Sequence, residues 1–225
     1  MDMNTIILAF IYLIGITLLL VVNEMGYRKL KIKGEVSRKI AHVVSTLSVL
    51  PFPYLFPSHW YVLVMAFIFF LVLFITQYKT QLKSIHDIDR KSIGSYLLPL
   101  SIYITFLIAE HFNSKLIFIL PMLILAISDP VAAIVGLSLK KYNHRIRIFG
   151  MDTGKSMFGS GAFFLSSFVL CLLAYCYSRG VCDVVALSLS LIVAFASTLG
   201  ELFSWHGSDN LSVPLSVILV LLTFN

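Results

Sequence analysis

Three ionisable residues far apart in the chain, Asp129, Lys155 and Asp209, have side chains that could bind a metal ion and an anionic ligand such as phosphate. Carboxylates bind Mg²⁺ together with substrate phosphates, and a lysine ammonium neutralises phosphate charge. Asp129 is the most informative, because it lies inside an apolar run, where a carboxylate costs at least about 2.5–3.5 kcal/mol. Pro130 follows it and lacks an N–H, which predicts a broken or kinked helix here. The alternative role for Asp129 is to cap the second half of that broken helix.

Lys155 belongs to a segment of small and hydroxyl residues that precedes an apolar run. Free backbone N–H groups at the start of a helix attract phosphate, and the lysine adds a full positive charge. The glycine spacing does not match a Walker loop, and we expect no β-strand before it. A plain flexible turn is the alternative. The residues predicted to bind phosphate here are Gly154, Lys155, Ser156, Gly159, Ser160, Lys140, Lys141 and Arg147.

Two further polar groups flank the apolar runs. Glu201, Asp209 and Asn210 supply hard oxygen ligands, so with Asp129 they form the predicted Mg²⁺ set. Their alternatives are a solvated acidic loop and a cap for the last helix. Arg38 and His42 are four residues apart and share a helix face, where they would bind a phosphate or carboxylate. An anchor for anionic lipid is the alternative for this pair.

The composition indicates a membrane protein that forms a single domain over residues 1–225. Of its 225 residues, 59% are hydrophobic and 12% are charged, and the mean hydropathy is +0.93. Soluble domains carry about 25% charged residues, so a soluble or a disordered chain is excluded. The net charge of +6 does not indicate nucleic-acid binding, because the basic residues lie in short gaps between apolar runs.

The apolar runs predict an all-α integral membrane protein with about eight transmembrane helices, one of them broken near Asp129 and Pro130. The second and last runs are short for a span. Cys171 and Cys176 lie inside one run, and we expect both to be buried thiols. The runs cover residues 4–22, 40–57, 60–77, 93–109, 116–139, 157–177, 184–199 and 211–224.

The basic residues predict the orientation. Of the 17 lysines and arginines, all but Lys115 and Arg179 fall in the first, third and fifth loops between the expected helices. The positive-inside rule then places the odd-numbered loops in the cytoplasm and both termini outside. The polar groups described above therefore gather on the cytoplasmic side.

Together these motifs resemble the membrane lipid-alcohol kinases, the phytol, dolichol and CTP-dependent diacylglycerol kinases, which share a superfamily with the phosphatidate cytidylyltransferases. Ser128 replaces a common glycine, and Met157-Phe158 replaces a common acidic position. The closing segment, from Asp209 to Leu215, is more similar to the kinase branch. The resembling segments are Arg38-Lys39-x-x-His42, Ser128-Asp129-Pro130-x-Ala132-Ala133-x-x-Gly136, Gly154-Lys155-Ser156-x-x-Gly159-Ser160, and Glu201 with Asp209-Asn210-Leu211-x-Val213-Pro214-Leu215.

The resemblance implies transfer of a phosphoryl group from a nucleoside triphosphate, typically CTP, to a long isoprenoid alcohol or diacylglycerol, with Mg²⁺. It implies Asp129, Lys155 and Asp209 as catalytic residues and a membrane lipid and a nucleotide as partners. The nearest alternative is cytidylyl transfer to phosphatidate. A small transporter is the second alternative, because transporters also place carboxylates in broken helices. The lipid, the oligomeric state and the carboxylate that acts as base stay open.

Overall fold

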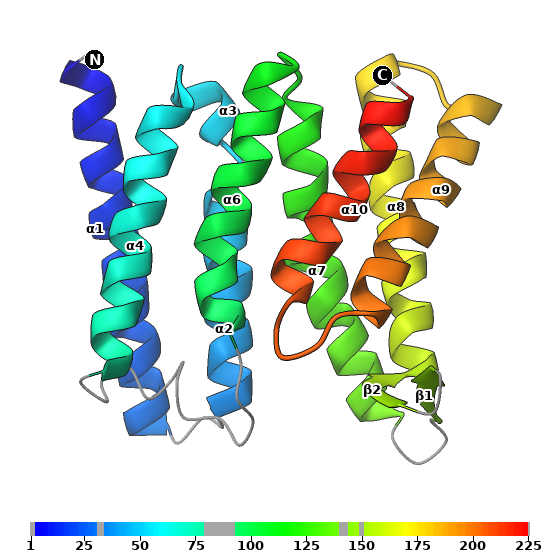
Figure 1. Cartoon of the computed structure of the whole chain (residues 1–225), viewed down its shortest axis with the longest axis horizontal. Helices are drawn as coiled ribbons and strands as arrows, with labels where there is room; N and C mark the ends of the chain where they lie inside the picture. The colour runs from blue at the N-terminus through cyan, green and yellow to red at the C-terminus, as the bar shows by residue number, and fades with distance from the viewer. Residues whose placement is uncertain (1–2, 31–33, 79–92, 140–143, 149–150, 225) are drawn as a thin grey trace.

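A computed structural model describes residues 3–30, 34–78, 93–139, 144–148 and 151–224. Long helices run side by side in alternating directions, and one small antiparallel hairpin lies at one end of the bundle (Figure 1). The elements are α1 (Met3–Leu30), α2 (Gly34–Ser48), α3 (Phe52–Leu55), α4 (His59–Tyr78), α6 (Gly94–His111), α7 (Leu116–Ser138), β1 (Arg145–Ile148), β2 (Met151–Ser156), α8 (Met157–Arg179), α9 (Val184–Leu202) and α10 (Asp209–Thr223).

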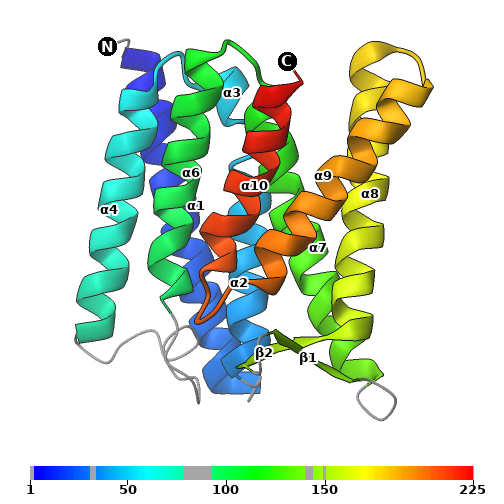
Figure 2. The ribbon, with the colours of Figure 1, turned by 45° about the vertical axis from the view of Figure 1, so that its right-hand side comes forward.

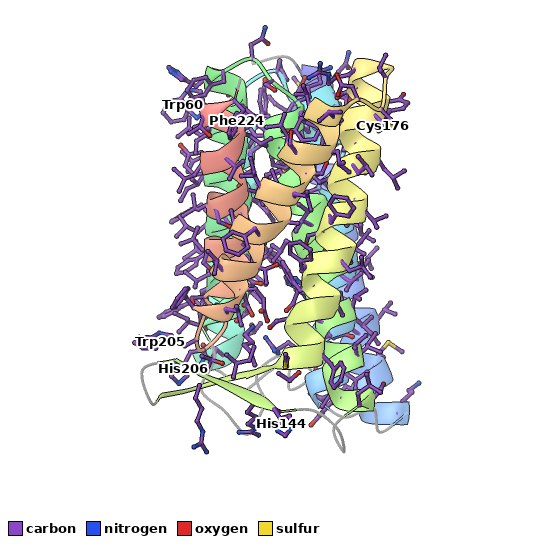
Figure 3. The ribbon with its side chains drawn as sticks, turned by 90° about the vertical axis from the view of Figure 1, so that its right-hand side faces the viewer. Trp60, His144, Cys176, Trp205, His206 and Phe224 are labelled. Carbon is purple, nitrogen blue, oxygen red and sulfur yellow. A yellow bond between two sulfur atoms is a disulfide. The ribbon has the colours of Figure 1, made fainter. Side chains whose placement is uncertain are left out.

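The bundle has two ends that differ in chemistry. We call the end with the β1–β2 hairpin the hairpin end, and the end with both chain termini the terminal end (Figures 1 and 2). His144 and His206 lie at the hairpin end, whereas Trp60, Cys176 and Phe224 lie at the terminal end (Figure 3). The predicted placement of both termini on one side is therefore confirmed.

The predicted all-α membrane architecture is also confirmed. Five of the described helices, α1, α4, α7, α8 and α9, are long and apolar enough to cross a membrane. Large apolar side chains such as Phe10 and Leu18 on α1 are exposed on the outside of the bundle, as expected where lipid surrounds it. Helices α2 and α10 have 15 residues each, which is short of the roughly 20 that a perpendicular span needs.

Helix α7 is the central element, and the predicted break within it is wrong. It packs against α8, α10, α2 and α6, and it continues as one helix through Pro121 and Pro130. Proline removes one backbone hydrogen bond, but spanning helices tolerate this where neighbouring helices enclose them. The side chain of Ser128, two residues before Pro130, is fully buried. Asp129 therefore does not cap a second half-helix.

Small residues bring α8 very close to α7. A Cβ atom at Gly159 would lie 2.9 Å from the carbonyl oxygen of Ala132 and 3.6 Å from the Cα of Gly136. Further along, Ser167 Oγ donates a hydrogen bond to Ser128 Oγ at 3.0 Å. The close approach at Gly159 fixes the start of α8 against the part of α7 that follows Asp129. The bond between Ser167 and Ser128 fixes the middle of α8 against the residue before Asp129.

Two sequence-based expectations are corrected at the ends of α8. A strand, β2, does precede this helix and contains Gly154, Lys155 and Ser156. The signal was the alternating Arg-Ile-Arg-Ile of its partner β1. Cys176 is not a free thiol, because it forms a disulfide with Cys182 across the α8–α9 loop. Cys171 is a buried free thiol, as predicted.

Candidate active site

The three residues singled out first come from different elements that meet near the hairpin end. Asp129 lies in the second half of α7, and Lys155 is the last residue but one of β2. Asp209 is the first residue of α10, and Glu201 is the last residue but one of α9. The ammonium of Lys155 interacts electrostatically with all three carboxylates, so the structure brings them to one site.

Lys155 forms the centre of this site. Its Nζ atom lies 2.8 Å from Glu201 Oε1 and 3.4 Å from Asp209 Oδ2. Burial alone would lower the pKa of the Lys155 ammonium, but the carboxylates of Asp209 and Glu201 outweigh burial and hold this pKa above its usual value. The lysine is therefore charged at neutral pH.

Glu201 is the most deeply buried carboxylate of the site, with 3% of its surface exposed. Its second carboxylate oxygen, Oε2, accepts a hydrogen bond from Ser160 Oγ at 3.2 Å. The solvated-loop alternative therefore does not apply to Glu201. Ser160, which we predicted to bind phosphate, contacts this carboxylate in the structure.

Asp129 has a cationic partner that the sequence analysis did not select. Lys39 Nζ, on α2, lies 3.3 Å from Asp129 Oδ2, and both side chains are largely buried. The sequence signal was present, because Lys39 stands between Arg38 and His42 in the same motif. Lys39 was not among the residues predicted to bind phosphate or metal.

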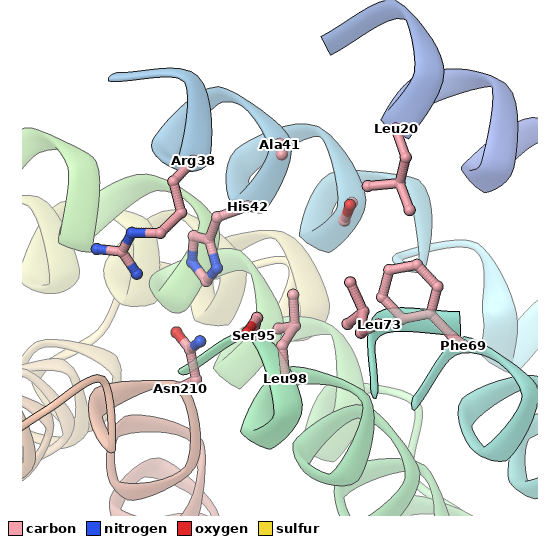
Figure 4. Close-up of a pocket in the computed structure, with 10 residues that line it drawn as sticks. Leu20, Arg38, Ala41, His42, Phe69, Leu73, Ser95, Leu98 and Asn210 are labelled. Atoms are coloured by element: carbon pink, nitrogen blue, oxygen red, sulfur yellow. The ribbon is translucent and has the colours of Figure 1, made fainter. Parts of the chain in front are cut away.

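Arg38 and His42 also face the interior, together with Asn210. All three line one cavity of about 40 Å³ (Figure 4). The Nε2 atom of His42 is buried and has no hydrogen-bond partner among the described residues, and its ring interacts electrostatically with Asp129 and Asp209. This inward orientation argues against the lipid-anchor alternative for the pair.

Asn210 has a structural contact as well as a place beside the carboxylates. Its Nδ2 atom donates a hydrogen bond to the carbonyl oxygen of Gly94 at 2.7 Å, which fixes the start of α10 against the start of α6. Ser208 occupies the N-cap position of α10, but its side chain makes no capping hydrogen bond there. Asp209, in the first turn, is placed where a carboxylate is favoured by the helix dipole.

The predicted phosphate cradle at the start of α8 is partly filled by the protein itself. The amide of Met157 donates to the carbonyl oxygen of His144 at 3.0 Å, and that of Gly159 donates to Ser156 Oγ at 3.2 Å. Gly154, which lies within β2 directly before Lys155, has a positive φ of 72°. Arg147 lies exposed on β1, and Lys140 and Lys141 lie outside the described residues.

The donor set fits a Mg²⁺ ion only in part. No group of three His, Cys, Asp or Glu side chains in the described residues is arranged to hold a metal ion. Mg²⁺, however, usually takes one or two carboxylates together with substrate phosphates and water, rather than a complete protein cage. Asp129 and Asp209 offer two such carboxylates, and both interact electrostatically with Lys155 and His42.

Comparison with known proteins identifies the family. A family model described as "Cytidylyltransferase family" matches residues 3–205. The chain belongs to the cytidylyltransferase family. The matched range contains Asp129, Lys155 and Glu201, whereas Asp209 and Asn210 lie beyond its end.

The chain is also similar to a curated Synechocystis sp. phytol kinase. The two sequences are 33% identical over 190 residues, which cover 83% of this chain and 78% of the relative. No solved structure matches the chain significantly. The resemblance to the phytol-kinase family found in the sequence is confirmed.

Proposed function

We propose that the protein is a membrane lipid kinase that transfers the γ-phosphoryl group of CTP to the hydroxyl of a long-chain isoprenoid alcohol of the phytol type. The observation that carries this proposal is the site around Lys155, where carboxylates and ammonium groups from separate helices and from β2 meet at one end of an apolar bundle. The relation to a phytol kinase supports the same reaction.

In this reaction the alcohol oxygen attacks the γ-phosphorus, and a new phosphorus–oxygen bond forms. The bond between the γ-phosphorus and the bridging oxygen of the β-phosphate breaks, and CDP leaves with that electron pair. The proton of the hydroxyl passes to a carboxylate of the site. Little covalent chemistry is required of the protein, so alignment and charge neutralisation supply the catalysis. Lys155 and Lys39 supply positive charge to the triphosphate in this mechanism.

The proposal includes Mg²⁺, which when bound would neutralise charge on the transferred phosphate. Asp129 and Asp209 would hold the ion, and Glu201 or Asn210 would complete its protein ligands. The two lysines that now neutralise these carboxylates would then be released toward the phosphate oxygens.

We propose further that the hairpin end faces the cytoplasm, where the nucleotide is available. The concentration of lysine and arginine in the odd-numbered loops supports this orientation. The Cys176–Cys182 disulfide supports it independently, because it lies at the terminal end and disulfides persist in oxidising compartments.

The fate of a phosphorus label tests the reaction. We expect purified protein in detergent, given phytol, Mg²⁺ and γ-labelled CTP, to move the label into the lipid. ATP and diacylglycerol serve as comparison substrates. A wild-type protein that labels no lipid alcohol with either nucleotide would refute the kinase proposal.

Cytidylyl transfer to phosphatidate is the second candidate, and the match to the cytidylyltransferase family favours it. There the lipid phosphate attacks the α-phosphorus, so the γ-label leaves as pyrophosphate and an α-label enters the lipid. The same assay with α-labelled CTP and phosphatidate separates the two reactions.

A further inference from the structure

The cavity that contains Arg38, His42 and Asn210 changes from polar to apolar along its length. Figure 4 shows His42 and Asn210 pointing toward one another on one side, with Phe69 and Leu73 of α4 on the other. Its remaining lining residues are Leu20, Ala41, Ser45, Ser95 and Leu98, and none of its lining residues is a carboxylate. The polar side of this cavity adjoins the site, since Asn210 directly follows Asp209.

A second cavity, of about 30 Å³, continues from the first toward the terminal end. The two share Ser45, Phe69 and Leu98, so they lie along one line between helices. The second is almost wholly apolar. Its other lining residues are Leu13, Ile16, Val49, Phe52, Val62, Met65, Ala66, Pro99 and Ile102. We call the line of the two cavities, between α1, α2, α4 and α6, the seam.

The seam has a definite length, and aromatic residues lie at its terminal end. On α4 its lining runs from Leu73 to Val62, which corresponds to about 16 Å at the helical rise of 1.5 Å per residue. At the terminal end its lining includes Phe52. The ring of Phe52 packs edge-on against Tyr12 and Phe56 at centroid distances of 5.2 Å and 4.9 Å. The seam thus runs from polar residues beside the site to aromatic residues near the terminal end.

Helix α1 forms the wall of the seam that the bundle holds least firmly. Only 6% of its membrane-spanning window is buried inside the protein, compared with 56% for α7. The two cavities are smaller than a long alkyl chain, so such a chain would enter by displacing α1.

We propose that the seam holds the single alkyl chain of the lipid alcohol, with its hydroxyl at the polar mouth between His42 and Asn210. This inference rests on the proposed kinase function. The buried and unpartnered Nε2 atom of His42 at the mouth points to a ligand that offers a hydrogen-bonding group there. The seam is a single row of two narrow cavities, so it accommodates one alkyl chain. Isoprenoid alcohols have one such chain and fit, whereas diacylglycerol has two and does not.

Filling the seam tests the proposal. Ala66 lines the second cavity, whereas Val64 on the same helix is 50% exposed toward the membrane, so Ala66→Trp and Val64→Trp form a matched pair. We expect Ala66→Trp to lower kcat/KM for phytol at least tenfold while changing that for the shorter alcohol geraniol less than twofold. Val64→Trp should change neither value.

Equal losses on phytol and geraniol, or no loss on either, would overturn the seam proposal. If Ala66→Trp does not fold, Ala66→Phe replaces it. Independently of turnover, a phytol analogue with a photoreactive group at the end of its tail should cross-link wild-type protein at Val49–Met65. Cross-links confined to α8 and α9 would contradict the seam. Absence of phosphoryl transfer by wild type would refute the kinase function, and the cross-link map would still decide on the seam.

Discussion

Replacing Lys155 by alanine is expected to lower phosphoryl transfer about 1,000-fold, which corresponds to about 4 kcal/mol of transition-state stabilisation. The reason is that the ammonium of Lys155 interacts with Glu201, Asp209 and Asp129 together. Its removal takes positive charge from the position where the triphosphate is expected. The measurement is the rate of transfer from γ-labelled CTP to phytol at saturating substrate.

The Lys155→Ala change needs a control for folding, because it leaves Glu201 buried without its cationic partner. Breaking a buried pair in this way costs about 3–5 kcal/mol of stability. The double variant Lys155→Met/Glu201→Gln removes both charges, so it should fold as wild type does and yet stay inactive. Lys115→Ala removes a lysine that lies over the Tyr54 ring near the terminal end and should keep full activity. Activity near that of wild type in the double variant would contradict the role of Lys155.

Replacing Asp129 by asparagine is expected to reduce turnover on the order of 1,000-fold with little change in protein yield. Asparagine keeps the shape of the side chain but loses the charge that pairs with Lys39 at 3.3 Å and that would hold Mg²⁺. The loss should be partly offset by raising the Mg²⁺ concentration, because a weakened metal site fills at higher concentration. The measurement is the rate of transfer as Mg²⁺ is titrated.

Asp183→Asn is the matched control for Asp129→Asn. Asp183 caps α9 and pairs with Arg179 near the terminal end, away from the carboxylate site. Its replacement should affect stability alone and leave transfer unchanged. If Asp129→Asn retains activity at every Mg²⁺ concentration, Asp129 is not a metal ligand.

The helices were predictable because each apolar run must bury its backbone polar groups within a helix to cross a membrane. The run predicted at 116–139 is helix Leu116–Ser138, and the run at 157–177 is helix Met157–Arg179. The prediction of one helix over residues 40–57 was less accurate. The run divides into α2 and the short α3, where Pro51 and Pro53 interrupt the pattern.

Other features could not be read from hydropathy, since they depend on contacts between distant segments. The pairing of Lys39 with Asp129 joins residues 90 positions apart. The Lys155–Glu201 pair depends on how the hairpin approaches the end of α9. The predicted break at Pro130 is wrong for a related reason, because enclosure by neighbouring helices keeps α7 intact around this proline.

The candidate site itself was largely predictable from residue types, because carboxylates and lysines beside apolar runs are costly unless they pair or bind a ligand. The structure brings together Asp129, Lys155, Glu201 and Asp209, as the sequence predicted. Their assignment to Mg²⁺ and to the triphosphate stays a prediction.

The central claim is that these residues from distant segments jointly bind a divalent ion and a triphosphate. A structure determined with Mg²⁺ and a non-hydrolysable CTP analogue tests it most directly. We expect the triphosphate to contact Lys155, with the ion between its oxygens and the carboxylates of Asp129 and Asp209. A triphosphate bound away from Lys155, with both aspartates still paired to lysines, would contradict the account.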